Sequence, residues 1–404
     1  MSNNGEAFVS FGNGEKALIV KCVIAFDEPV TSFRFSLSTL LTIDNISADA
    51  DSEWKIIKEW QPQWRHKSNE IEVSGKTPMQ ELTIEYHGHV SNLYHGCYLG
   101  WCNIIQDKRI ALSAYSAWTI EDTSVPVRFI FKIAGLSGYF VINSRYDDVE
   151  KLWVYGETNH EEGNIIALKK GHYYEASTGD FRFYYMNEDE KEYAHNYVSN
   201  YDNIMAYFAS VFGEKNIGKM SIVSLGIKVG NGAYIRKELM VIEKINVVED
   251  KEKIRQNVIG LLGHELGHNW FTGADTTTWE DWLNETGAEW AALLYILSLD
   301  EKEFFESHLS RAKEKYKETP IIKSPDGKRP VDGIHIRGVM MFYEIYQKYG
   351  IETITAILKI LSAMKLKTTE NFLFEVKNNI DNDIAEKIEQ GLTVKDYSDL
   401  FRSE

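Results

Sequence analysis

Apolar residues alternate with polar residues through the first half of this chain, and that pattern constrains the fold more than any other feature. It is clearest in residues 33–40 (FRFSLSTL), 82–88 (LTIEYHG) and 127–133 (VRFIFKI). Such alternation puts successive side chains on opposite faces of a strand, so that one face is buried. The pattern predicts an antiparallel, sandwich-like β domain over residues 1–185.

The spacing of apolar residues lengthens in the second half of the chain. Tyr197, Tyr201 and Ile204 are spaced four and three residues apart, which is typical of one face of a helix. Two strand-like segments follow, and helical patterns dominate from Lys251 to the C-terminus. We therefore predict an α+β fold, with a mainly helical second domain over residues 186–404.

The charge balance argues against two classes of partner. The sequence has 44 Lys and Arg residues against 60 Asp and Glu residues, for a net charge of −16. Such a chain repels the phosphates of nucleic acids and anionic lipid surfaces. No apolar run is long enough to span a bilayer, and the N-terminus lacks the pattern of a secretory signal. We expect no nucleic-acid partner, no membrane association and a cytoplasmic location.

The cysteines are few and odd in number: Cys22, Cys97 and Cys102. An odd set is poor material for a disulfide framework, and it fits a reducing compartment. Cys97 and Cys102 lack the second pair that would complete a four-ligand zinc site. Free thiols are the better interpretation.

Three histidines lie close together in the β half, at His87, His89 and His95. Strand alternation would place two of them on one face, where they could bind a metal ion. No cysteine or carboxylate accompanies them at a supporting spacing. Surface or loop histidines are therefore the better interpretation.

The segment HELGHNWF carries two histidines one helical turn apart. We predict a single helix that begins after the N-cap Asp250 and runs through Phe271. His264 and His268 then share a face from which both imidazoles reach one Zn²⁺, with Glu265 beside the open coordination position. The alternative is a solvated helix face that carries two histidines by chance. The apolar stripe of this helix consists of Ile254, Val258, Leu261 and Leu262.

A second, acidic helix is predicted shortly afterwards, in TTTWEDWLNETGAEWAALLYIL. Glu285 can complete a His₂Glu zinc site. Glu289, one turn later, can accept a hydrogen bond from the second ring nitrogen of a ligating histidine and fix its tautomer. The alternative for Glu289 is an exposed helix residue. Gly287, between the two, would allow two helices to approach closely.

HELGHNWF followed by WLNETGAEW resembles the gluzincin metallopeptidases of the aminopeptidase N and leukotriene hydrolase family. The flanking NWF and WLNE match, although the 16 residues between His268 and Glu285 form a shorter spacer than the family has. The β half is also similar to the family's N-terminal saddle. The resemblance implies a short form with a thermolysin-like catalytic domain and one Zn²⁺ per chain, held by His264, His268 and Glu285.

One departure from the family concerns the substrate's free amino terminus. The family's exopeptidases hold that group with the glutamate of a GxMEN segment. The nearest match here is GAYIR, which places Ile235 where the glutamate belongs. Isoleucine offers an ammonium group no charge, so exopeptidase specificity stays open. Glu238 is the nearest residue that could replace this glutamate. Alternatively, Glu238 is a solvent-facing strand residue without that role.

A second departure concerns the tyrosine that stabilises the oxyanion in this family. His335 stands at its place in HIRGVMMFYEIYQKYG, and Arg337 and Gly338 match the basic residue and glycine that follow. A protonated imidazole also donates to a developing oxyanion, so the role can pass to His335. The alternative is an ordinary loop histidine. Tyr343 and Tyr346 are weaker replacements because they lie further inside the helix.

Together these residues predict a zinc-dependent metallopeptidase that hydrolyses peptide bonds with a zinc-activated water. Glu265 is the predicted general base, and His335 assists the oxyanion. The resemblance favours an aminopeptidase-type reaction and leaves an endopeptidase open. Two alternatives are a zinc-containing scaffold protein that has lost turnover and a zinc hydrolase with a non-peptide substrate. The expected partner is a peptide, and the sequence does not fix the oligomeric state.

Overall fold

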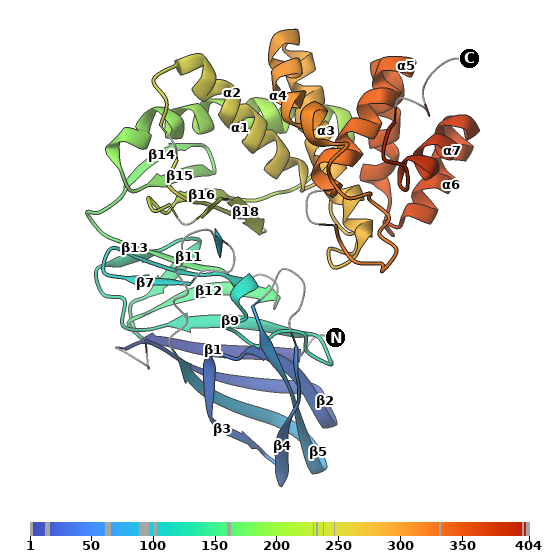
Figure 1. The fold of residues 1–404 in the computed structure, drawn as a ribbon. Helices are drawn as coiled ribbons and strands as arrows, with labels where there is room; N and C mark the ends of the chain where they lie inside the picture. Colours follow the sequence, from blue (N-terminus) through green and yellow to red (C-terminus); the bar gives the residue numbers. More distant parts are fainter. Residues whose placement is uncertain are drawn as a thin grey trace. The chain divides into compact units, whose positions relative to one another are not determined.

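The chain forms two compact units, each built from two segments of the sequence (Figure 1). The first unit comprises Met1–Glu190 and Lys219–Asn246, and the second comprises Lys191–Gly218 and Val247–Glu404. Strands dominate the first unit and helices the second, which confirms the predicted α+β class. The computed structural model describes residues 3–12, 17–60, 66–88, 97–99, 103–159, 163–228, 230–231, 233–236, 238–245, 247–330, 333–397 and 400.

A mixed sheet of eight strands forms the largest part of the first unit. Its neighbouring strands are antiparallel, except that β1 and β9 run parallel, with Gly5 beside Phe129. The predicted antiparallel sheet thus contains one parallel pair, which alternation could not reveal because it reports which face is buried and not the direction of a neighbour. The strands, in order across the sheet, are β11 (Ser144–Asp147), β12 (Leu152–Asn159), β9 (Val127–Ile133), β1 (Asn3–Phe11), β2 (Leu18–Ser38), β5 (Ser68–Gly88) and β3 (Leu41–Ala48), with β4 (Ser52–Trp60) also paired to β5.

Three smaller sheets belong to the same unit. The first contains β10 (Tyr139–Val141), β13 (Ile165–Lys169), β8 (Arg109–Leu112) and β7 (Ile104–Gln106). The second contains β14 (Tyr174–Thr178), β15 (Phe181–Tyr185), β16 (Met220–Ser224), β19 (Leu239–Ile242) and β18 (Ala233–Arg236). The third pairs β17 (Gly230–Asn231) with β6 (Cys97–Tyr98).

The alternating residues form the core of the large sheet. Cys22 lies opposite Ile84 in the β2–β5 pair, and its sulfur is 3.8 Å from the hydroxyl oxygen of Tyr86. Burial raises the pKa of the Cys22 thiol to about 12, so the predicted free thiol is confirmed and is neutral. All the residues that the alternation assigned to the inner face are buried: Phe33, Phe35, Leu37, Leu82, Ile84, Tyr86, Val127, Phe129, Phe131 and Ile133.

Parts of the cysteine and histidine predictions fall outside the described residues. Cys102, His89 and His95 are among these, as is the side chain of Cys97. His87 lies at the end of β5, where its Nδ1 is 2.7 Å from a carboxylate oxygen of Asp44. Within the described part of the chain, His87 belongs to no group of side chains that could hold a metal ion.

Seven helices make up most of the described part of the second unit (Figure 1). The first buries Tyr197, Tyr201 and Ile204 and ends directly before Gly213, as predicted. None of the helices in the described ranges combines the length and the apolar character needed to cross a membrane. The helices are α1 (Lys191–Phe212), α2 (Lys251–Gly267), α3 (Trp282–Ser298), α4 (Lys302–Lys315), α5 (Gly333–Ala363), α6 (Thr369–Asn379) and α7 (Asn382–Gly391).

Helices α2 and α3 pack closely because small residues meet between them. A methyl group added at Gly267 would lie 3.0 Å from the backbone of Ala288, so a larger residue there would push the helices apart. Gly287 was the predicted point of close approach, but it faces the ring of Phe271, which would lie 2.3 Å from an added methyl group. The close contact between the two helices therefore lies one residue further along α3.

Candidate metal centre

Helix α2 begins and ends in ways that position two histidines. The carboxylate of Asp250 accepts hydrogen bonds from the backbone amides of Glu252 and Lys253, which confirms it as the N-cap. The helix ends at Gly267, and not at Phe271 as predicted, but the next residue, His268, keeps helical backbone angles. His264 and His268 therefore retain the spacing of one helical turn.

The predicted apolar stripe of α2 is correct except at one position. Ile254, Val258 and Leu262 are buried, whereas Leu261 is exposed. Ile259 and Leu266 are buried instead. The wider buried arc reflects neighbours on two sides, since α2 packs against both α1 and α3.

Three predicted ligands converge where α2 meets α3. Nε2 of His264 lies 3.2 Å from Nε2 of His268. Oε2 of Glu285 lies 3.4 Å from the first nitrogen and 3.5 Å from the second. These three residues form the group of side chains, among those described, whose donor atoms are close enough to share one metal ion.

The outer nitrogens of both imidazoles are engaged by the protein. Nδ1 of His264 lies 2.8 Å from Oε2 of Glu289, and Nδ1 of His268 lies 3.2 Å from the carbonyl oxygen of Phe271. A carboxylate and a carbonyl accept hydrogen bonds, so both Nδ1 atoms donate. Each Nε2 therefore faces the centre, which is the arrangement that a metal-binding imidazole needs.

The inward oxygen of Glu285 provides a test of whether a cation fits. Oε2 is buried and makes no hydrogen bond with any described residue. Its distances to the two Nε2 atoms exceed those of good hydrogen bonds but allow both nitrogens and the oxygen to surround one ion. A carboxylate and two imidazoles are a donor set that Zn²⁺ accepts. The residues therefore fit a zinc ion.

The electrostatics of the centre favour positive charge. Burial lowers the pKa of His264, but the neighbouring carboxylates of Glu285 and Glu289 outweigh burial and raise that pKa well above its ordinary value. Burial raises the pKa of Glu285, but the surrounding imidazoles outweigh it and hold that pKa well below its ordinary value. A cluster whose carboxylates stay ionised and stabilise positive charge on the imidazoles is also one that stabilises a metal cation.

Glu265 lies beside the three donors without joining them. Its side chain is nearly enclosed, and its negative charge raises the pKa values of both neighbouring histidines. Burial, followed by the charge of Glu265, also raises the pKa of Tyr197 on α1. Glu265 is therefore a largely buried carboxylate close to both histidines.

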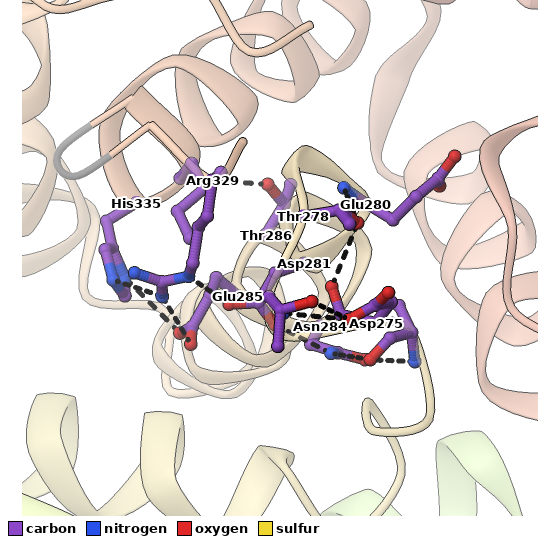
Figure 2. A network of polar contacts seen from close by, with 12 residues as sticks. Asp275, Thr278, Glu280, Asp281, Asn284, Glu285, Thr286, Arg329 and His335 are labelled. Atoms are coloured by element: carbon purple, nitrogen blue, oxygen red, sulfur yellow. Dashed lines mark hydrogen bonds and ion pairs between the residues drawn. The ribbon is translucent and has the colours of Figure 1, made fainter. Parts of the chain in front are cut away.

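His335, at the start of α5, also reaches this centre. Its Nδ1 lies 3.3 Å from Oε2 of Glu285, and Figure 2 shows the two side chains pointing toward each other. Its ring centroid lies 6.4 Å from that of His264. The other candidate donors make different contacts: Tyr343 lies 3.1 Å from the amine of Lys313, and Tyr346 packs on Trp290.

An arginine that was not predicted from the sequence links these groups. Nε of Arg329 lies 2.5 Å from a carboxylate oxygen of Asp281, and its Nη2 lies 3.5 Å from Oε1 of Glu285 (Figure 2). The same Nη2 lies 3.4 Å from Nε2 of His335. Glu285 thus presents one oxygen to the guanidinium and the other to three imidazoles, those of His264, His268 and His335. The acidic WED segment before WLNE was the available signal for a basic partner.

Arg337 and Gly338 contribute to packing and not to the chemistry of the metal centre. The guanidinium of Arg337 is fully buried and donates to the carbonyl oxygens of Tyr316 and Val394. Gly338 faces Thr286, whose hydroxyl oxygen would lie only 1.9 Å from an added methyl group. The glycine therefore lets α5 approach α3 directly beside Glu285.

The predicted amine-anchor region belongs to the first unit. Ile235 lies on β18, paired with Met240 of β19, and Glu238 lies in the turn between these strands. Residue 235 thus lies on a strand, and its side chain is a hydrocarbon. Whether Glu238 substitutes for the family's glutamate remains a prediction.

Comparisons with known proteins give a relationship at the level of the fold. No protein-family model matches the chain, and no curated protein sequence matches it. The structure of leukotriene A4 hydrolase from Saccharomyces cerevisiae is similar over 96% of this chain and 67% of that one, with a TM-score of 0.70 and 11% identity. A second structure of the yeast enzyme gives the same coverage, with a TM-score of 0.69 and 12% identity. This chain therefore shares its α+β fold with leukotriene A4 hydrolase.

Proposed function

We propose that this protein is a zinc-dependent metallopeptidase. The observation that carries the proposal is the convergence of His264 Nε2, His268 Nε2 and the unbonded Oε2 of Glu285, with Glu265 beside them. The fold shared with a hydrolase supports the proposal at the level of architecture. The proposed partner is a peptide, not a nucleic acid.

The proposed site residues have two main roles, metal binding and proton transfer. His264, His268 and Glu285 would hold one Zn²⁺, and the ion would polarise a substrate carbonyl and make a water molecule more acidic. The carboxylate of Glu265 accepts a proton from the attacking water and passes it to the leaving nitrogen. Glu289 accepts the Nδ1 proton of His264 in a hydrogen bond and keeps its ring in place.

His335 is the proposed oxyanion donor because it is the accessible imidazole. Its side chain is 44% exposed, compared with 16% for His264 and 20% for His268. Arg329 beside it adds a fixed positive charge. Burial lowers the pKa of His335, so its neutral ring would turn its single N–H from Glu285 to a substrate oxygen that gains negative charge beside the guanidinium of Arg329.

The proposed reaction is aminopeptidase-type, which rests on the family resemblance alone. Ile235 argues against it, because a hydrocarbon cannot anchor an ammonium group. A mixed peptide library, digested with and without a chelator and read by mass spectrometry, separates the outcomes. Single-residue losses from the amino terminus support the aminopeptidase, and internal cuts replace it with an endopeptidase.

The central test uses Glu265→Gln with the exposed Glu249→Gln as a matched control. We expect wild type and both variants to bind one zinc per chain. Hydrolysis should fall about 100- to 10,000-fold in Glu265→Gln and stay unchanged in Glu249→Gln. Unchanged hydrolysis by zinc-loaded Glu265→Gln would remove the general-base assignment.

A second candidate is a zinc hydrolase with a non-peptide substrate. It is favoured by the names of the similar structures, which are those of a leukotriene A4 hydrolase, and by the hydrocarbon at Ile235. Incubation of the zinc-loaded protein with a lipid epoxide and, separately, with the peptide library distinguishes the two. Turnover of the epoxide alone selects this candidate, and turnover of neither selects a zinc-containing scaffold protein.

A further inference from the structure

His308, on α4, contacts the far side of the carboxylate that orients His264. Its Nε2 lies 2.7 Å from Oε1 of Glu289, while Oε2 of the same carboxylate lies 2.8 Å from Nδ1 of His264. Glu289 is therefore held at both oxygens by imidazoles from two different helices. The three side chains form a continuous polar chain from α4 through α3 to α2.

Gly260 provides the space that this arrangement needs. A methyl group added there would lie 2.6 Å from Cε1 of His308 and 3.0 Å from its Nδ1. Gly260 lies on α2, one turn before His264, where a glycine weakens a helix relative to alanine. The absence of a side chain at Gly260 lets the ring of His308 reach Glu289. The hydrogen bond and this steric fit are independent observations.

We infer that His308 is a positioning residue for the metal centre. It fixes the carboxylate of Glu289, which in turn keeps the Nδ1 of His264 engaged and its Nε2 directed at the centre. The two histidines donate to opposite oxygens, so neither can be lost without freeing the carboxylate to rotate. This role rests on the proposed zinc site, and it concerns His308 itself, which no spacing in the sequence connects to that site.

The test compares three variants at one position. Gln places an amide near the position of the imidazole Nε2, so His308→Gln should keep the bond to Glu289. His308→Asn is too short to reach it, and His308→Leu has no donor. Zinc competition with a chromophoric chelator should show His308→Gln within about threefold of wild type, and the other two about tenfold weaker, at the low end of what loss of an outer partner costs.

A second measurement does not depend on zinc. In the metal-free protein, the Nδ1 proton of His264 should give a downfield proton resonance that exchanges slowly with solvent, assigned by its loss in His264→Gln. It should persist in His308→Gln and exchange at least about tenfold faster in His308→Asn. Gly260→Ala, which leaves both histidines and Glu289 intact, should have the same effect as His308→Asn. Unfolding transitions of each variant control for loss of the fold.

The outcomes separate this inference from the proposed function. If wild type binds no zinc but the resonance responds as expected, His308 orients His264 through Glu289 as inferred, whereas the zinc peptidase and the service of this contact to a metal are both wrong. If wild type binds one zinc while His308→Asn and His308→Leu match it in both affinity and proton exchange, the positioning role of His308 is wrong and the zinc site stands.

Discussion

Buried ionisable groups behave in opposite ways in the two units. In the first, Cys22 and Tyr86 lie together in the sheet core, and burial raises both pKa values so that both groups stay neutral. In the second, His264 and Glu285 are largely but not fully buried, and their mutual attraction outweighs burial and favours their charged forms. Enclosure alone makes a structural core, whereas enclosure with opposite charges gathered around one point indicates a functional site.

Removing the carboxylate from the charged cluster should have the largest effect. Glu285→Ala deletes one of three donors, so zinc affinity should fall by more than the roughly 10- to 100-fold that loss of an outer partner costs. Chelator competition measures the affinity, and Cys22→Ala, in the neutral pair, should bind zinc as wild type does. If Glu285→Ala bound zinc with an affinity within threefold of wild type, the contrast between the charged cluster and the neutral Cys22–Tyr86 pair would be wrong.

Removing the cation that faces the other oxygen of Glu285 should be the next largest change. The side chains of Arg329 and Asp281 are 9% and 2% exposed, so Arg329→Met leaves a carboxylate buried without its cation. The free energy of unfolding should fall by about 3 kcal/mol in a denaturant titration. Asp281→Asn combined with Arg329→Met should recover part of that loss, and an additive double variant would show that the pair is not coupled.

A steric change beside Glu285 should have a moderate effect. Gly338→Ala places a methyl group 1.9 Å from the hydroxyl oxygen of Thr286, so α5 must move away from α3. We expect a loss of about 2 kcal/mol in the free energy of unfolding. Thr286→Ala in the same chain removes the obstructing oxygen and should make the glycine substitution less costly, measured as a double-mutant cycle.

The neutral pair should give the smallest effect, and only at high pH. The folded pKa of Cys22 is raised from 9.0 to about 12, so the thiol's contribution is complete below pH 9 and declines between pH 9 and 12, as the unfolded chain ionises first. Between pH 8 and 10, wild type should lose about 1 kcal/mol more of its unfolding free energy than Cys22→Ser. Parallel pH profiles of the two proteins would contradict the burial of the thiol.

Local patterns in the sequence predicted much of the fold and the inner half of the site. Alternation identified the buried strand residues, and one helical turn fixed the geometry of His264 and His268, because both depend only on near neighbours in the chain. The parallel β1–β9 pair and the early end of α2 were missed, since strand direction and helix ends depend on contacts elsewhere. Arg329 and His308 were missed for a similar reason: they reach Glu285 and Glu289 from distant segments.

The contact of Gly267 with Ala288 has a consequence for which ions the protein can bind. Because Gly267 has no side chain, the backbone of α2 passes so close to α3 that an added methyl group would lie 3.0 Å from the backbone of Ala288. This close approach of the two main chains keeps the span between the donors of α2 and α3 short. Such a short span suits an ion with short bonds, and it disfavours calcium, whose longer bonds and larger number of oxygen ligands require a wider cage.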